Sequence, residues 1–204
     1  MGLKKKKENP ERERLEKELE AAKETAKSGT DDDKRALAHA YDNLAFAYKG
    51  EKDIDKALEC HLQSYKIFKE LSAKCHSAQI DSEYASSCGN VGAICKDIGN
   101  IKQAEEFYGE AIALAKVSAD ELRTPKAYNT YALLCFEAGV LNRKKPDREL
   151  LMEAHGVWEI LGKEYPNNKL YTSMRSSVAI VLNEKYKKKR RSLWGMFAKK
   201  RRRR

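Results

Sequence analysis

Two asparagine side chains stand at matching points of a repeated pattern and could hold the backbone of a bound peptide. Asn43 precedes Leu44-Ala45, and Asn90 precedes Val91-Gly92. A carboxamide both donates and accepts hydrogen bonds, so a row of such side chains can bind an extended chain without reading its sequence. The same amides could instead satisfy neighbouring helices, and the sequence leaves both roles open.

Nucleophilic and metal-binding residues are present, but they are not spaced for catalysis or for a metal site. The five cysteines are Cys60, Cys75, Cys88, Cys95 and Cys135. An odd number without a secretory signal is typical of reduced thiols in the cytosol or nucleus. Cys60-His61 and Cys75-His76 are adjacent pairs, and adjacent side chains on a helix point about 100° apart, which disfavours shared ligation of one ion. Phosphate-binding glycine loops and G-x-S-x-G or H-E-x-x-H motifs are missing. We therefore expect a protein that is not an enzyme and holds no cofactor or metal.

The C-terminal end combines cationic and aromatic side chains. Two basic blocks flank Ser192–Ala198, and residues 185–204 hold twelve Lys/Arg and no acid. This composition is consistent with adsorption to an anionic membrane, a two-cluster nuclear-import signal, nucleic-acid contact with a stacked ring, or a solubility tail. The residues expected to contact an anionic partner are Lys187, Lys188, Lys189, Arg190, Arg191, Trp194, Phe197, Lys199, Lys200 and Arg201.

The charge of the remaining chain argues against a nucleic-acid-binding body. The formal net charge of the 204 residues is +10, but residues 31–184 carry −4. A body that bound nucleic acid should carry its own basic stripe. Any anionic partner would therefore meet the tail first.

An internal repeat predicts the elements that position these side chains. The first copy has small residues at Ala45, Ala57 and Ser64, and the second has Gly92, Ala104 and Ala111 at the same offsets. Spacings of three and four between the flanking large residues keep them on one helical face, and small residues let two helices approach closely. Asp53 and Gly99-Asn100 lie where the turn between paired helices is expected, with Gly99 just past a helix end.

This pattern resembles the tetratricopeptide repeat (TPR), a helix-turn-helix unit with small residues at its eighth, twentieth and twenty-seventh positions. The small residues Ala45, Gly92 and Ala132 lie 47 and 40 positions apart, which favours a long-helix variant such as that of the kinesin light chain. The resemblance implies an all-α solenoid of about three helix-turn-helix repeats closed by a C-terminal capping helix. It covers residues 35–184.

The third repeat and the two ends complete the expected organisation. Residues 127–132 echo residues 40–45, an insertion follows Gly139, and Asp147 is expected to cap a helix carrying Leu150, Leu151, Ala154, Trp158 and Leu161. A last helix runs from about residue 169 to 186 and carries Tyr171, Met174, Val178 and Val181. We divide the chain into a charged, partly helical segment (1–29), repeats (30–184) and a basic tail (185–204). Leu15 and Leu19 predict a helix in the first segment that packs loosely on the repeats or forms only in part, and Thr30 with Asp33 predicts a capping box after it.

The resemblance also implies which residues line a concave groove for a partner peptide or helix. By repeat, these are His39, Asp42, Asn43, Phe46 and Lys49; Ser86, Gly89, Asn90, Ala93 and Lys96; and Lys126, Asn129, Thr130, Leu133 and Phe136. The family's chaperone-binding branch grips a terminal carboxylate with cations and asparagines. Asp42 would repel that carboxylate, and Phe46 and Thr130 also depart from the pattern, so we expect no such clamp. His61 stands where the repeat usually has an aromatic residue and is expected to be a packing residue.

Together these observations predict an interaction adaptor that binds a partner protein in the groove, while the tail sets its location. The alternative is a nucleic-acid-binding or membrane-peripheral protein that acts through the tail. A cytoplasmic or nuclear location follows for the adaptor, and a membrane-peripheral one if the tail binds lipid.

Overall fold

The computed structural model describes residues 9–27, 29–142 and 144–183, and in this part of the chain every regular element is a helix. The helices are α1 (Pro10–Ala26), α2 (Asp31–Gly50), α3 (Ile54–Cys75), α4 (Ala78–Asp97), α5 (Ile101–Leu122), α6 (Pro125–Gly139) and α7 (Arg148–Glu164). Residues 169–183 are also helical. The basic tail and its aromatic residues lie outside the described residues.

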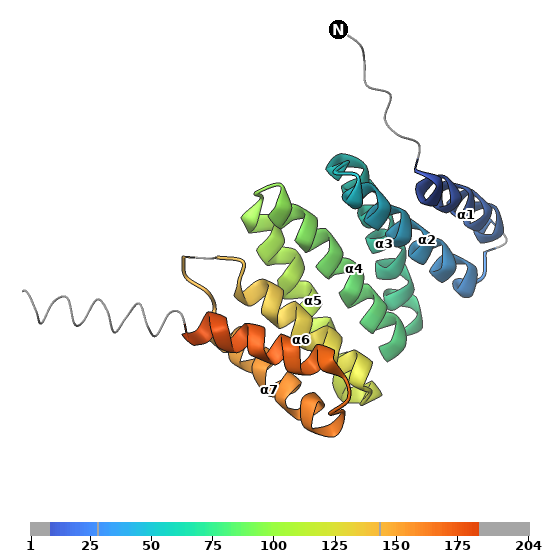
Figure 1. The fold of residues 1–204 in the computed structure, drawn as a ribbon. Helices are drawn as coiled ribbons and strands as arrows, with labels where there is room; N and C mark the ends of the chain where they lie inside the picture. Colours follow the sequence, from blue (N-terminus) through green and yellow to red (C-terminus); the bar gives the residue numbers. More distant parts are fainter. Residues whose placement is uncertain (1–8, 28, 143, 184–204) are drawn as a thin grey trace, which may run out of the picture. The chain divides into compact units, whose positions relative to one another are not determined.

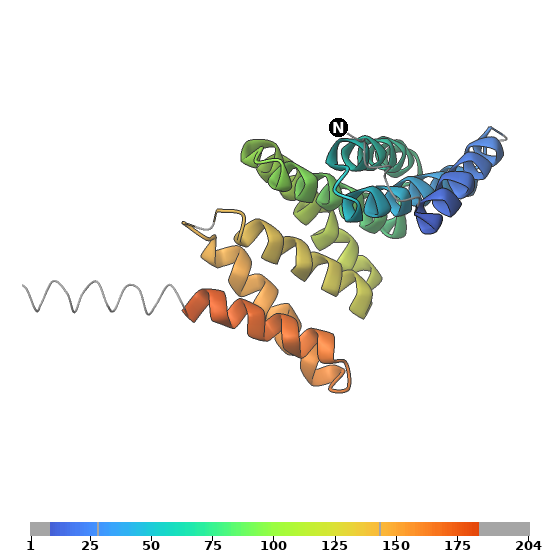
Figure 2. The same ribbon diagram turned by 45° about the horizontal axis from the view of Figure 1, so that its top comes forward.

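The chain divides into two compact units, and the boundary between them along the chain falls within α6, between Ala127 and Tyr128. In the first unit each helix packs against the next, from α1 on α2 to α4 on α5 (Figures 1 and 2). The predicted all-α helical repeat is confirmed by this succession of packed helices.

The repeat in the first unit has a period of 47 residues. The bounds of α2 and α3, moved by 47, are the bounds of α4 and α5. The backbone follows the same period: Lys52 and Gly99 have φ of +63° and +83°, and His76 and Arg123 have φ of +45° and +50°. A left-handed backbone conformation costs energy for a residue that has a side chain, so its recurrence at equivalent turns shows that both repeats impose the same chain path.

Side-chain caps fix several helix starts as the sequence predicts. The Thr30 side chain accepts a hydrogen bond from the Asp33 N–H, and the Asp147 carboxylate accepts from the Glu149 and Leu150 N–H groups. Asn100 caps α5 by accepting from the Gln103 N–H, directly after Gly99. Such a cap is worth about 1 kcal/mol, because it satisfies backbone donors that have no partner within the helix.

Small residues bring the paired helices together. Ala45, Ala57 and Ala104 are fully buried. Gly92 faces the ring of Tyr108 so closely that an added Cβ would lie 3.4 Å from three ring atoms. The sequence-predicted small positions are therefore buried where helices pack together.

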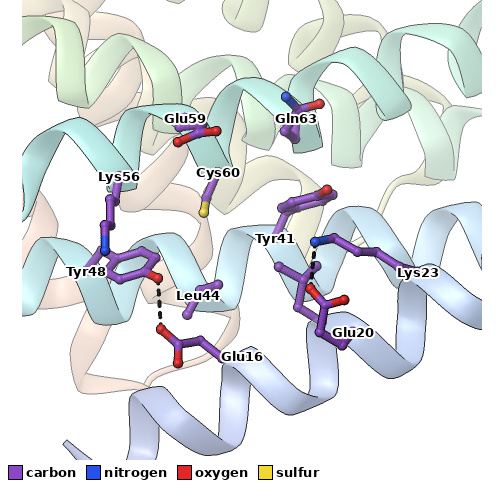
Figure 3. A pocket seen from close by; sticks show the side chains of 11 residues that line it. Glu16, Glu20, Lys23, Tyr41, Leu44, Tyr48, Lys56, Glu59, Cys60 and Gln63 are labelled. Carbon is purple, nitrogen blue, oxygen red and sulfur yellow. Dashed lines mark hydrogen bonds and ion pairs between the residues drawn. The ribbon is translucent and has the colours of Figure 1, made fainter. Parts of the chain in front are cut away.

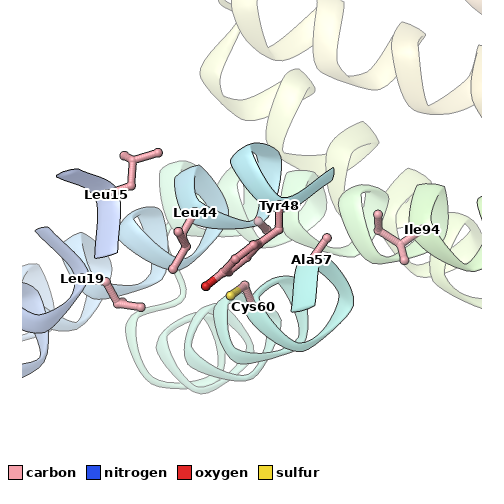
Figure 4. Packing of buried hydrophobic residues seen from close by; sticks show 8 residues of the cluster. Leu15, Leu19, Leu44, Tyr48, Ala57, Cys60 and Ile94 are labelled. Atoms are coloured by element: carbon pink, nitrogen blue, oxygen red, sulfur yellow. The ribbon is translucent and has the colours of Figure 1, made fainter. Parts of the chain in front are cut away.

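The helix before the first repeat is complete and firmly packed. Leu15 and Leu19 of α1 are buried in one cluster with Leu44, Tyr48 and Cys60 (Figure 4). The Asn9 side chain caps this helix, and Pro10 occupies its first turn, where a missing N–H costs nothing. The two buried leucines dock this mostly charged helix together with polar contacts from Asn9 and Arg12 to Glu51 and from the Tyr48 hydroxyl to Glu16.

In the second unit, most of the apolar residues predicted along α7 are buried. Leu151, Ala154, Trp158 and Leu161 are buried there, as are Tyr171 and Val178 of the helix over residues 169–183. Gly139 ends α6 against α7, and a Cβ on it would lie 2.9 Å from Leu151 Cγ. This contact makes Gly139 a packing requirement.

Gly139→Ala should lower the free energy of unfolding by about 1–3 kcal/mol, because the added methyl overlaps Leu151. The matched control is Gly109→Ala on α5, where an added Cβ meets no atom within 4 Å. That substitution should raise stability by about 0.5–1 kcal/mol, since alanine favours helix over glycine. Urea unfolding of both variants measures the difference, and equal stabilisation by the two would contradict this account.

Candidate functional site

Two ion pairs hold α2 and α4 side by side. Arg35 Nε lies 2.7 Å from Glu83 Oε2, and Lys49 Nζ lies 2.9 Å from Asp97 Oδ2. The two pairs are separated by 14 residues on both helices, so α2 and α4 run parallel and in register. We call the surface between these pairs the α2–α4 face, made up of Arg35, His39, Asn43, Phe46, Lys49, Glu83, Asn90 and Asp97.

Glu83 is the most strongly perturbed carboxylate on this face. Burial alone would raise its pKa, but hydrogen bonds from His39, Arg35 and Gln79 favour the charged form, and the net result is a pKa lowered to about 2. Its side chain is only 13% exposed. Glu83 is therefore a firm link between α2 and α4, unlike the half-exposed Lys49–Asp97 pair, for which about 0–1 kcal/mol is typical.

The two repeat-equivalent asparagines lie on this face at nearly the same height. Asn43 follows Arg35 by eight residues and Asn90 follows Glu83 by seven, or about 12 Å and about 10 Å along the helix axes. Asn43 is exposed and Asn90 is half-buried. Neither side chain has a hydrogen-bond partner in the described part of the chain. Beside them, the Phe46 side chain is 53% exposed.

A buried polar network lies beneath Phe46, between α2 and α3. Asp42 Oδ1 lies 2.7 Å from His61 Nδ1, and Asp42 Oδ2 accepts a hydrogen bond from Ser64 Oγ at 2.8 Å. The Ser87 hydroxyl of α4 donates to Ser64 Oγ. Phe46 meets the His61 ring edge to face, with centroids 5.1 Å apart. Asp42, expected on the groove surface, is thus buried, because two partners on α3 satisfy its carboxylate; His61 is a packing residue as predicted.

The network replaces an apolar arrangement found in the next repeat. Positions 42, 61 and 64 correspond at a period of 47 to Gly89, Tyr108 and Ala111, which are all buried. The first repeat therefore holds an Asp–His–Ser network where the second holds glycine, tyrosine and alanine. Gly89, which we also expected to line the groove, is buried at this helix contact.

The other predicted groove residues lie on α4 and α6. Lys96 is half-buried and Lys126 is exposed, while Leu133 is 41% exposed. The Asn129 Oδ1 atom accepts a hydrogen bond from Trp158 Nε1 at 2.9 Å, so this amide supports the packing of α7. Lys126 belongs to the first unit, and Asn129 and Leu133 belong to the second.

A second candidate site is a cleft between α1, α2 and α3, with a volume of about 450 Å³. We call it the α1–α3 cleft (Figure 3). Its inner wall includes Leu19, Leu44 and Cys60, and Tyr41 and Tyr48 stand along it. Charged side chains surround this wall; the complete lining is Glu16, Leu19, Glu20, Lys23, Tyr41, Leu44, Tyr48, Lys56, Glu59, Cys60 and Gln63.

The polar groups of the cleft are held in their neutral or paired forms. Burial raises the pKa of the Cys60 thiol to about 11, so this thiol is protonated at neutral pH and a poor nucleophile. Burial and the hydrogen bond from its hydroxyl to Glu16 raise the pKa of Tyr48 to about 12. Lys56 Nζ lies 5.1 Å from the centre of the Tyr48 ring. The cleft therefore offers apolar and aromatic surface beneath an ionic rim.

Sequence reasoning missed this cleft, whose trace in the repeat is a small side chain in its wall. Cys60 corresponds to Phe107 at the period of 47. The mismatch between these two residues was the available signal. In the residues that the structure describes, no group of His, Cys, Asp or Glu is placed to hold a metal ion. Within the same residues, no helix is long and apolar enough to cross a membrane.

Comparisons with known proteins find similar solved structures only. No family model matches the chain, and no curated protein matches it. BtubC (BKLC) from P. vanneervenii is 15% identical, with 85% of this chain and 91% of that chain covered and a TM-score of 0.37. A putative kinesin light chain from Podospora anserina with nearly identical TPR-like repeats is 14% identical, with coverage of 87% and 99% and a TM-score of 0.34. The designed helical repeat protein DHR64 is 17% identical, with coverage of 88% and 93% and a TM-score of 0.31. The assignment to helical repeat proteins rests on the packed helices described above.

Glu83→Gln should destabilise the protein at pH 7 but not at pH 2. The folded-state pKa of Glu83 lies below the usual 4.5, so its contribution is complete above pH 4.5 and is lost as the pH falls toward 2. A shift from 4.5 to about 2 corresponds to about 3 kcal/mol. Urea unfolding from pH 7 to pH 2 should show the two stability curves converging, whereas parallel curves would contradict the assignment. Glu106→Gln, which replaces an exposed carboxylate on α5, is the control and should change stability by less than about 0.5 kcal/mol.

Proposed function

We propose that this chain is a TPR-like adaptor without enzymatic activity and that its α2–α4 face binds an extended segment of a partner protein. The single observation that carries the proposal is the pair Asn43 and Asn90. These amides occupy equivalent positions on two parallel helices, stand at nearly the same height and have no partner in the described part of the chain.

The geometry favours an extended partner over a helical one. The two amides stand on separate, parallel helices, so an extended peptide that crosses from α2 to α4 would present backbone groups to both of them. The backbone groups of a helical partner are already hydrogen-bonded within the helix and leave little for the amides to bind. Phe46 beside Asn43 supplies apolar contact, and Lys49 at the end of the face supplies charge.

Lys96 on α4 and Lys126 at the start of α6 are secondary contacts in this proposal. Asn129 and Leu133 belong to the second unit, where the amide nitrogen of Asn129 and the exposed Leu133 side chain form a separate candidate contact. The repeats at residues 30–184 are thus the binding domain, and the basic tail at residues 185–204 sets where the adaptor acts in the cell.

Replacing both amides tests the proposal. Peptides selected by display on the immobilised full chain at about 1 M salt, where tail electrostatics are screened, serve as probes. Asn43→Ala with Asn90→Ala should weaken their binding at least about thirtyfold, since two or more hydrogen bonds of about 1 kcal/mol each are lost. Fluorescence anisotropy measures the dissociation constants.

The control pair is Asn167→Ala with Asn183→Ala, which removes two exposed amides from the second unit. Binding should be unchanged by this pair. Equal affinity of the selected peptides for the Asn43/Asn90 variant and the wild type would show that the amides are not the binding groups. Failure to select any peptide at high salt, with capture of nucleic acid or anionic vesicles at low salt, would favour the alternative in which the tail does the binding.

A further inference from the structure

We propose that the α2–α4 face selects an uncharged partner segment, and that Phe46 sets this preference by packing against an apolar side chain of the partner. Phe46 can do so only if Asn43 and Asn90 bind the backbone of that segment, so this assignment rests on the proposed function. It adds the chemistry of the side chains that the bound segment carries.

Phe46 lies between the two amides, on the side of α2 that faces α4. It follows Arg35 by eleven residues, or about three helical turns, so it points in the same direction as the Arg35 side chain that reaches Glu83. Asn90 follows Glu83 by seven residues, or about two turns, and therefore points toward α2. Asn43 is turned about 80° around α2 from the direction of Arg35. A segment that crosses from Asn43 to Asn90 therefore passes beside the Phe46 ring.

Packing within the described part of the chain does not account for an aromatic ring at this position. The Phe46 side chain is 53% exposed, and the ring it meets there is that of His61. The equivalent position of the next repeat is Ala93, so the same helix pair forms without a ring. Full burial of a phenylalanine can contribute about 1.5–3 kcal/mol, much of which is forgone at half exposure. An apolar side chain of the partner would supply the missing burial.

The Phe46 ring rests on a support that is itself fixed. His61 is 1% exposed, and its Nδ1 atom lies 2.7 Å from Asp42 Oδ1. The other oxygen of this carboxylate accepts a hydrogen bond from Ser64 Oγ. The imidazole beneath Phe46 is therefore held in place, so the ring loses less side-chain freedom on binding than an unsupported surface residue would.

The ionic groups of the α2–α4 face are already paired with one another. Arg35 is paired with Glu83, and Lys49 with Asp97. A charged side chain of the partner would lose hydration here and would compete with the pairs that link the two helices. The contacts that remain are two neutral amides and an apolar ring, and both kinds favour an uncharged segment.

Removing the ring tests the contact, with the peptides selected on the full chain as probes. Phe46→Ala should weaken their binding at least about tenfold, because the ring contact and its burial are lost. Phe46→Leu keeps an apolar side chain and should recover part of this loss. The matched control is Val117→Ala, which removes an exposed apolar side chain from α5 and should leave binding unchanged. Equal affinity of the Phe46→Ala chain and the wild type would overturn the proposal.

A double-mutant cycle identifies the partner side chain that meets the ring. The apolar residues of a selected peptide are replaced by alanine one at a time, and anisotropy gives the dissociation constants for the wild type and for Phe46→Ala. One replacement should cost at least about fivefold more in the wild type than in the variant. Costs that are equal in the two chains at every peptide position would show that no side chain packs on Phe46 and would overturn the proposal.

Placing a charge at that peptide position tests the preference for an uncharged segment. Peptides with glutamate or with lysine there should each bind the wild type at least about tenfold more weakly than the selected peptide at about 0.15 M salt. The Phe46→Lys chain should regain binding of the glutamate peptide but not of the lysine peptide. Because the basic tail is present in both chains, its attraction for the glutamate peptide cancels in this comparison. Undiminished binding of both charged peptides to the wild type would overturn the preference.

The same measurements separate this assignment from the proposed function. Loss of binding in the Asn43/Asn90 variant with unchanged binding in Phe46→Ala would keep the α2–α4 face as the site and overturn the role of Phe46. Unchanged binding in both variants, or failure to select any peptide, would overturn both. Dependence on Phe46 without dependence on the amides would overturn the proposed function and support Phe46 as the selecting residue.

Discussion

The close approach of paired helices is the constraint on which the rest of the first unit depends. The alanines at positions 45, 57 and 104 are fully buried and place only a methyl group at their points of helix contact. At Gly92 the Tyr108 ring lies within van der Waals reach of the place where a Cβ would stand. Once these contacts set the spacing of one pair, the same pattern 47 residues later sets the next pair in the same way.

This repetition in turn creates the α2–α4 face. Equivalent helices of successive pairs run parallel, so Arg35 and Lys49 meet Glu83 and Asp97 without any change of register. Side chains between the two ion pairs are then presented at matched heights. Asn43 and Asn90 form such a pair, at equivalent positions of the two repeats.

The fold could be predicted largely because helix packing leaves a strong periodic pattern. Small residues, Thr30, Asp147 and Gly99 each act through local sequence, and the structure has each in its predicted role. Asp42 was harder to place, since a carboxylate is ordinarily a surface group and its partners His61 and Ser64 lie a full helix away. The Asn129 contact with Trp158 was equally remote in sequence. The α1–α3 cleft left only an indirect trace, a cysteine where the next repeat has phenylalanine.

The departures from the repeat concentrate the chemistry of the molecule in its first helix pair. The second pair uses Gly89, Tyr108 and Ala111 at the helix contact and Phe107 at its side, and all of this surface serves packing. The first pair holds Asp42, His61 and Ser64 at the same contact, which fixes one arrangement of α2 and α3 through directed hydrogen bonds. That rigid pair then carries Phe46 on one side and an unfilled space beside Cys60 on the other. A repeat whose copies were identical would have neither feature, whereas the equivalent amides Asn43 and Asn90 come from the likeness of the two copies.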